Sequence, residues 1–202
     1  MRNTLFSLAL TLSMVIPAVA LSAPDVRNGD IIFHQSVSFQ SKALEIATRS
    51  PYTHCGIVFF KDEKPYVFEA VHTVSWTPLN DWIKRGIEGR YVLMRLKQPL
   101  DEKGERSLRE AASDFVGKGY DLFFNWSDET IYCSELAWKV YDRALGLSLI
   151  PLKTFRDYEL DHEEVQRIVK ERFKIDIPWD EYAATPADLM ESDLLQTIDM
   201  QQ

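Results

Sequence analysis

The chain has 202 residues, of which 46% are hydrophobic, 12% aromatic and 27% charged. This composition excludes a disordered or fibrous protein and predicts one compact globular unit. The sequence holds 23 Lys and Arg residues against 31 Asp and Glu residues, a net charge of -8, and the acidic residues are spread along the chain. Because nucleic acids and anionic membrane surfaces require a concentrated basic face, we expect neither as a partner.

The first 20 residues have the pattern of a secretory signal peptide. Arg2 precedes an apolar run from Leu5 to Ile16, and Pro17 leads into the small-residue sequence Ala18-Val19-Ala20. The run is shorter than the roughly 18 to 20 residues that a membrane-spanning helix needs, and no later segment is apolar enough to span a bilayer. We therefore expect residues 1–20 to be removed, which leaves a single domain over residues 21–202 in the periplasm or secreted.

The first predicted elements of the mature chain are a short strand and a helix. Gly29 to Phe33 is typical of a turn leading into a strand, and Ser36 to Arg49 has helical spacing that Ser50-Pro51 ends. Two β-rich runs, 52–60 and 66–71, then flank a polar turn. They predict an antiparallel hairpin.

This hairpin places two polar residues on one face. If the turn holds an even number of residues, positions of opposite parity face one another, so His54 and Glu69 share a face and Cys55 points to the other. A carboxylate on the neighbouring strand can accept a hydrogen bond from one imidazole nitrogen and leave the other free as a base. The alternative is a surface His and a solvated Glu, so the pair needs a third member before it indicates function.

The middle and end of the chain add further elements. We expect a loop with a short helical start over 76–82, and the aromatic residues of 120–126 belong either to the core or to the wall of an apolar cleft. We also predict a strand over 91–96 and a helix over 102–116 that ends at Gly117 and Gly119. A packing helix is expected after Asp161.

Cys133 falls at the start of a predicted helix. Apolar residues recur every four positions from Leu136 to Ala144, and Gly146 marks the end of the helix. A thiol at a helix start meets the positive end of the helix dipole, which favours the thiolate, and the unpaired first N–H groups can bind an oxyanion. The alternative is a buried small side chain with no chemical role.

The two cysteines of the chain, Cys55 and Cys133, allow two interpretations. In an oxidising compartment a cysteine pair commonly forms a disulfide. Alternatively, one of the two is a free nucleophile. Composition does not decide between these, and the surroundings of each cysteine have to.

Five short motifs follow one another along the chain: Gly29-Asp30-Ile31-Ile32, Thr53-His54-Cys55-Gly56-Ile57-Val58, Phe68-Glu69-Ala70, Tyr120-Asp121 and Tyr132-Cys133-Ser134-Glu135-Leu136. In this order they resemble the permuted papain-like amidases, the YiiX/YaeF-like branch of the NlpC-type cysteine hydrolases. The resemblance implies an α+β, circularly permuted papain-like fold with an antiparallel sheet packed against the helix that carries the nucleophile. In ordinary members of the superfamily the cysteine helix precedes the histidine strand, whereas here the order is reversed.

The resemblance also implies roles for three residues. Cys133 resembles the nucleophile, His54 its general base, and Glu69 the polar residue that orients His54. Cys55 departs from the apolar residue that is commoner between the His and the Gly, and its opposite facing predicts a buried, inert thiol. A cysteine beside the base is a poor place for a structural disulfide.

We predict neither a metal nor a cofactor. The four histidines have no ligand spacing, and the glycines near residue 118 lack the Lys-Ser/Thr of a phosphate loop. The expected function is hydrolysis of an amide, with export and the resemblance favouring a cell-wall peptide as substrate. The alternatives are a lipid-directed thioesterase or acyltransferase, and a non-catalytic binding module in which Cys55 and Cys133 form a disulfide.

Overall fold

A computed structural model describes residues 24–173 and 177–201, so the expected signal peptide lies outside the described residues. The helices and strands follow in the order β1 (Ile31–His34), α1 (Phe39–Thr48), β2 (His54–Lys61), β3 (Lys64–Ala70), β4 (Val74–Pro78), α2 (Leu79–Arg85), η1 (Ile87–Gly89), β5 (Tyr91–Leu96), α3 (Glu102–Ser113), β6 (Gly119–Tyr120), β7 (Thr130–Ile131), α4 (Cys133–Leu145), β8 (Lys153–Thr154), η2 (Phe155–Asp157), α5 (Glu163–Phe173), β9 (Tyr182–Ala183), α6 (Pro186–Met190) and β10 (Leu195–Gln201).

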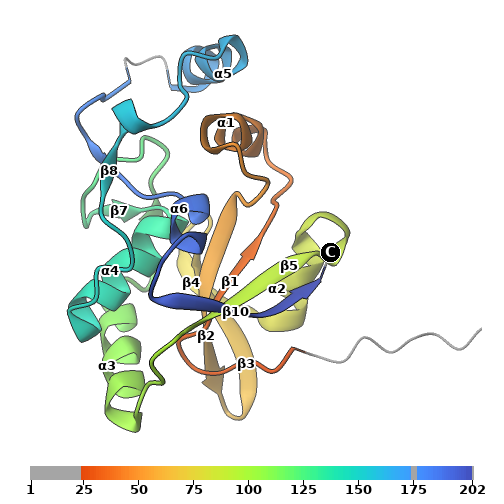
Figure 1. Cartoon of the computed structure of the whole chain (residues 1–202), viewed down its shortest axis with the longest axis vertical. Coiled ribbons are helices and arrows are strands. Elements are labelled where there is room, and N and C mark those ends of the chain that lie inside the picture. The colour runs from red at the N-terminus through yellow and green to blue at the C-terminus, as the bar shows by residue number, and fades with distance from the viewer. Residues whose placement is uncertain (1–23, 174–176, 202) are drawn as a thin grey trace, which may run out of the picture.

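The centre of the molecule is a six-stranded antiparallel sheet in the order β10-β5-β1-β2-β3-β4 (Figure 1). The buried strands β1 and β2 lie in its middle, and their register places His34 opposite His54. Two further pairs of two-residue strands, β6 with β7 and β8 with β9, brace the loops around α4.

The β2–β3 hairpin confirms the predicted sharing of faces. Its turn consists of only two residues, Asp62 and Glu63, both with positive φ angles of 48° and 61°, as a tight hairpin turn requires. Val58 pairs with Val67, so residues of opposite parity are partners, and His54 and Glu69 project from one face.

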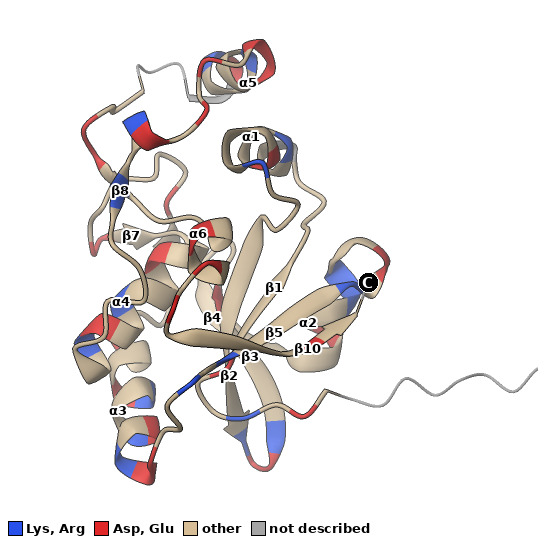
Figure 2. Cartoon of the chain, in the orientation of Figure 1, with Lys and Arg blue, Asp and Glu red and all other residues tan. Residues whose placement is uncertain are grey.

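Helices cover both faces of the sheet. On one face α3 and α4 pack over Cys55, Ile57 and their apolar neighbours, and on the other α2 buries Trp82 against a smaller cluster. The helices α1 and α5 pack against each other beyond one end of the sheet (Figure 1). Lys, Arg, Asp and Glu are scattered over the helices and turns, while the central strands carry few of them (Figure 2).

The structure corrects the expectation for residues 76–82. Val74–Pro78 is the edge strand β4 rather than a loop, and Leu79–Arg85 forms α2, so only the short helical start was predicted. Pro78 is tolerated because it is the last residue of an edge strand. None of the described helices is long and apolar enough to cross a membrane.

Candidate active site

Cys133 is the first residue of α4 and is buried. Tyr132 precedes it in extended conformation and caps the helix, and the Glu135 carboxylate accepts the Tyr132 N–H at 3.3 Å. Glu135 is itself buried and paired with Lys139 at 2.7 Å, so the start of α4 is held in place from two directions. The thiol therefore has a fixed position at the positive end of a 13-residue helix.

The structure brings Cys133, His54 and Glu69 together. His54 opens β2, and its Nε2 lies 2.7 Å from Glu69 Oε2 on the neighbouring strand. The Cys133 thiol and the His54 side chain lie close enough for each to shift the pKa of the other. Because Nε2 is engaged by the carboxylate, Nδ1 is the ring nitrogen left for the thiol.

Glu69 is fully buried yet surrounded by donors. Besides His54, its carboxylate accepts hydrogen bonds from Thr77 Oγ1 at 2.5 Å, from Trp82 Nε1 at 2.9 Å and from the Arg85 guanidinium. Burial acts to raise the pKa of Glu69, but these hydrogen bonds and the neighbouring charges outweigh it and lower the pKa to about 2. The carboxylate is therefore ionised at neutral pH.

Cys133 and His54 favour an ion pair. The hydrogen bond from Cys55 and the charge of His54 hold the pKa of Cys133 well below its usual range, against the opposing effect of burial. Burial also acts to lower the pKa of His54, but the interactions with Cys133 and Glu69 outweigh it and raise the pKa to about 9. At neutral pH this arrangement favours a thiolate beside an imidazolium.

Cys55 is buried on the opposite face of β2 from His54, as predicted, but it is not isolated from the site. Its thiol interacts with that of Cys133 and lowers the Cys133 pKa, while burial raises the pKa of Cys55 and keeps it protonated. Both thiols are free in the structure.

Sequence reasoning missed the groups that support this site. Thr77 comes from β4, and Trp82 and Arg85 come from α2. The predicted loop with a short helical start over 76–82 concealed the first two, and Arg85 lies beyond that stretch. His34 was also missed. Its ring is stacked on Trp82 with centroids 4.0 Å apart and lies 5.2 Å from the ring of His54, and burial lowers its pKa to about 3. The alternation of Ser75, Trp76 and Thr77 was the available signal for the strand.

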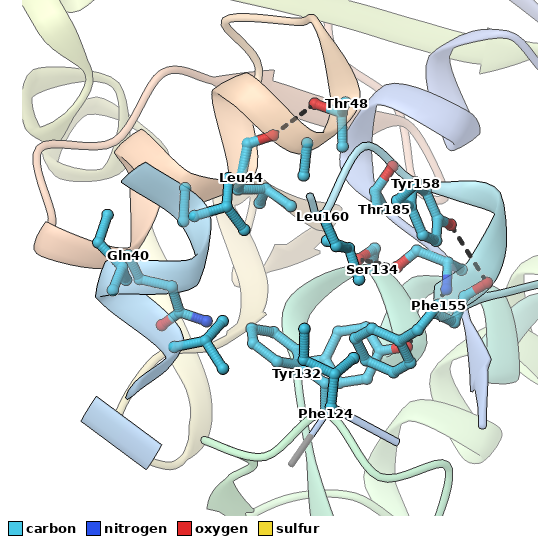
Figure 3. A pocket seen from close by; sticks show the side chains of 18 of the residues that line it. Gln40, Leu44, Thr48, Phe124, Tyr132, Ser134, Phe155, Tyr158, Leu160 and Thr185 are labelled. Atoms are coloured by element: carbon cyan, nitrogen blue, oxygen red, sulfur yellow. Dashed lines mark hydrogen bonds between the residues drawn. The ribbon is translucent and has the colours of Figure 1, made fainter. Parts of the chain in front are cut away.

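An apolar pocket has Cys133 among the residues that line it. Figure 3 shows this pocket from close by. We call it the α1–α5 pocket, because these helices form two of its walls and the start of α4 a third. Its lining includes Leu44, Phe124, Tyr132, Cys133, Phe155 and Ile168. Both expected locations are therefore found for the aromatic residues of 120–126. Phe123 and Phe124 line the pocket, while Tyr120 and Trp126 pack against the core.

Comparison with known proteins identifies the fold. Residues 25–199 match the family described as permuted papain-like amidase enzyme, YaeF/YiiX, C92 family. The chain belongs to this family. The permuted papain-like fold with its antiparallel sheet packed against α4 is confirmed, and the chain is a papain-like cysteine amidase by family.

Two relatives of this amidase family extend the match over almost the whole chain. The uncharacterized protein YiiX of Escherichia coli strain K12 is 39% identical over 198 residues, which are 98% of this chain and 96% of YiiX. A crystal structure described as metalloprotein yiiX from Escherichia coli O157:H7 superposes with a TM-score of 0.84 at 40% identity, covering 87% of this chain and 97% of that one. Within residues 24–173 and 177–201 of the present amidase, no three His, Cys, Asp or Glu side chains are arranged to hold a metal ion.

Proposed function

We propose that this amidase is an exported cysteine hydrolase in which Cys133 is the nucleophile, His54 the general base and Glu69 the residue that orients His54. One observation carries the proposal: His54 Nε2 lies 2.7 Å from Glu69, while the same ring and the Cys133 thiol lie close enough to shift each other's pKa. A nucleophile, a base and an orienting carboxylate in contact are the requirement for covalent catalysis.

The reaction proceeds in two steps. The Cys133 thiolate attacks the amide carbonyl and forms a C–S bond. The imidazolium of His54 gives its proton to the leaving nitrogen as the C–N bond breaks, which releases an amine and leaves a thioester. Water, deprotonated by His54, then attacks the thioester, so that a carboxylic acid leaves and Cys133 is regenerated. Glu69 holds the imidazole in one tautomer throughout.

The start of α4 supplies the oxyanion site in this scheme. The first N–H groups of a helix have no acceptor in a preceding turn, and they lie next to the sulfur because Cys133 is itself the first helical residue. Such donors stabilise the negative charge that develops on the carbonyl oxygen. The enzyme therefore needs no charged side chain for this purpose.

The signal-peptide pattern and the amidase family together point to a substrate in the cell envelope. A cell-wall peptide is the first candidate, since it offers amide bonds in the compartment to which the chain would be exported. The α1–α5 pocket favours a second candidate, an acyl substrate of the kind that a lipid-directed thioesterase or acyltransferase uses. Turnover of acyl esters without any amide would contradict the amidase assignment for this chain.

Alkylation tests the proposed nucleophile. We expect iodoacetamide to modify Cys133 rapidly at about pH 6, well below the ordinary thiol pKa of about 8.5, because the site favours the thiolate. Peptide mass mapping separates the label on Cys133 from any label on Cys55, so Cys55, which helps to hold the Cys133 pKa down, stays in place. Replacing His54 with Ala should slow labelling of Cys133 at least tenfold, and Cys133→Ala should abolish amide hydrolysis.

Three results would contradict the proposal. A native mass two hydrogens below that of the dithiol would indicate the Cys55–Cys133 disulfide of a non-catalytic module. A Cys133 that labels slowly and regardless of His54 would indicate an inert thiol. Unchanged hydrolysis by Cys133→Ala would place the chemistry elsewhere.

A further inference from the structure

The two-step reaction makes no use of His34, a buried histidine beside the base. We propose that His34 donates a hydrogen bond from Nε2 to the amine half of the substrate, so that the enzyme prefers amides whose leaving amine carries a carbonyl group, as the amine half of a peptide does. The inference rests on the proposed function, because it takes Cys133 as the nucleophile and His54 as the group that protonates the leaving nitrogen.

His34 lies at the end of the sheet where the catalytic groups meet. It is the last residue of β1 and pairs with His54, the first residue of β2, so both side chains project from one face at one end of the sheet. The centroids of the two rings are 5.2 Å apart. His34 is 2% exposed, which is comparable with the 4% of Cys133, a residue that must touch the substrate. Low exposure therefore does not exclude contact between His34 and a substrate.

One nitrogen of the His34 ring is closed off from any ligand. Nδ1 is buried and has no hydrogen-bond partner among the described residues. Gly86 lies against it, since a Cβ added at Gly86 would be 2.8 Å from this atom. Nε2 is therefore the ring nitrogen that a bound molecule can reach.

The His34 ring is neutral and carries its proton on Nε2. Burial lowers the pKa of His34 to about 3, and the positive charges of His54 and Arg85 act in the same direction. A neutral imidazole has one N–H and one acceptor nitrogen, and an unpartnered buried N–H is rarer in proteins than an unpartnered acceptor. The N–H therefore lies on Nε2, where it is a donor for a substrate oxygen.

Packing alone does not explain a histidine at this position. The ring is stacked on Trp82, with centroids 4.0 Å apart and planes inclined by 14°. Phenylalanine would form the same stack without burying a nitrogen that has no partner, and burying such a nitrogen lowers stability. An unpartnered polar group in a native protein calls for an explanation, and contact of the same ring with a substrate provides one.

The position of His34 selects the amine half of the substrate. Cys133 belongs to the core cluster that α3 and α4 cover, whereas Trp82 belongs to the cluster on the α2 face of the sheet. Because His34 stacks on Trp82, it lies on the α2 side of His54, away from the sulfur. In the proposed reaction the carbonyl oxygen binds at the start of α4 and the leaving nitrogen faces His54. The amine half beyond that nitrogen therefore extends toward His34.

Two amides with the same acyl half test this contact. The probes are N-acetylalanyl-glycinamide and N-acetylalanyl-isobutylamide, whose amine halves have the same branching but differ in the presence of a carbonyl group. Wild-type kcat/KM should favour the glycinamide. His34→Phe should lower the ratio of the two kcat/KM values about 2- to 12-fold, the range expected for one neutral hydrogen bond. His34→Gln, which keeps an N–H donor, should retain most of the preference.

The ratio isolates the contact, because a change at His54 would slow both substrates alike. His162→Phe replaces an exposed histidine just before α5 and is the matched control, which should leave the ratio unchanged. Labelling of Cys133 by the chloroacetyl derivatives of the same two amines gives the ratio without turnover, since the sulfur displaces chloride and the amine half stays attached. Urea unfolding should show that His34→Phe is at least as stable as wild type.

The outcomes separate this inference from the proposed function. No preference for the glycinamide in wild type, or the same ratio in wild type and His34→Phe, overturns the contact and leaves the cysteine hydrolase standing. A His34→Phe protein of clearly lower stability also overturns it, because the imidazole would then serve packing. Hydrolysis that persists in Cys133→Ala overturns the proposed function itself, and the contact with His34 falls with it.

Discussion

Glu69 is the most heavily constrained side chain of the site. A carboxylate with no exposure to solvent is costly unless its oxygens are fully used, and here four side chains from three elements donate to it. The consequence reaches the base, because the ionised Glu69 both fixes the imidazole and favours its protonated form. The pH dependence of the enzyme should therefore depend on this one charge.

Glu69→Gln tests that dependence. The hydrolysis of an amide requires the thiolate–imidazolium pair, so the alkaline limb of the kcat/KM profile should lie near pH 9, the raised pKa of His54. Removing the carboxylate charge lowers that pKa, so the limb should move toward lower pH while kcat/KM falls at least about 100-fold. Glu105→Gln, which removes a carboxylate bonded to Asn28, is the matched control and should change neither. An alkaline limb that stays in place would show that the Glu69 charge does not set the pKa of His54.

The β2–β3 hairpin is the element that carries both His54 and Glu69, and its spacing depends on Gly56. A Cβ added at this residue would lie 2.8 Å from the Phe68 carbonyl oxygen and closer still to Val67. The obstruction involves backbone, so a side-chain rotation does not relieve it. Gly56 is thus required for the close approach of the two strands.

Gly56→Ala should therefore weaken both stability and catalysis. We expect a loss of about 1 to 3 kcal/mol in the free energy of unfolding, as for other overpacked sites. We also expect a fall in kcat/KM, because the added carbon would push β3 away from β2 and so move Glu69 away from His54. Gly119→Ala has room for the added carbon, with Thr130 Cγ2 at 3.6 Å, and should cost much less. Denaturant unfolding and amide turnover measure the two effects. Wild-type turnover by a stably folded Gly56→Ala protein would contradict this account.

The same hairpin shows how far local pattern can predict the site. Strand alternation has a period of two, so the shared face of His54 and Glu69 followed from the sequence alone. The other donors to Glu69, Thr77, Trp82 and Arg85, did not, because they come from β4 and α2, where a loop with only a short helical start over 76–82 was predicted. The α1–α5 pocket was further out of reach, since its walls are separated by more than a hundred residues and only the tertiary fold brings them together.

For the whole molecule, the number of protons that the site binds in the folded and unfolded states predicts how the free energy of unfolding varies with pH. Around neutral pH, folded His54 holds a proton that the unfolded chain lacks, while folded Cys133 lacks one that the unfolded chain holds. The two differences cancel, so this pair adds no net slope to the free energy of unfolding. On the acid side no such cancellation operates for Glu69.

Glu69 should therefore make the protein sensitive to acid. Its pKa is lowered from 4.5 to about 2 in the folded state, so its contribution is present above pH 4.5 and is lost as the pH falls toward 2. The shift corresponds to about 3 kcal/mol. Urea unfolding at a series of pH values should show wild-type stability falling over this interval, with a shallower fall for Glu69→Gln, which has no proton to bind there. Parallel curves for the two proteins would show that the buried carboxylate is not the group that acid titrates.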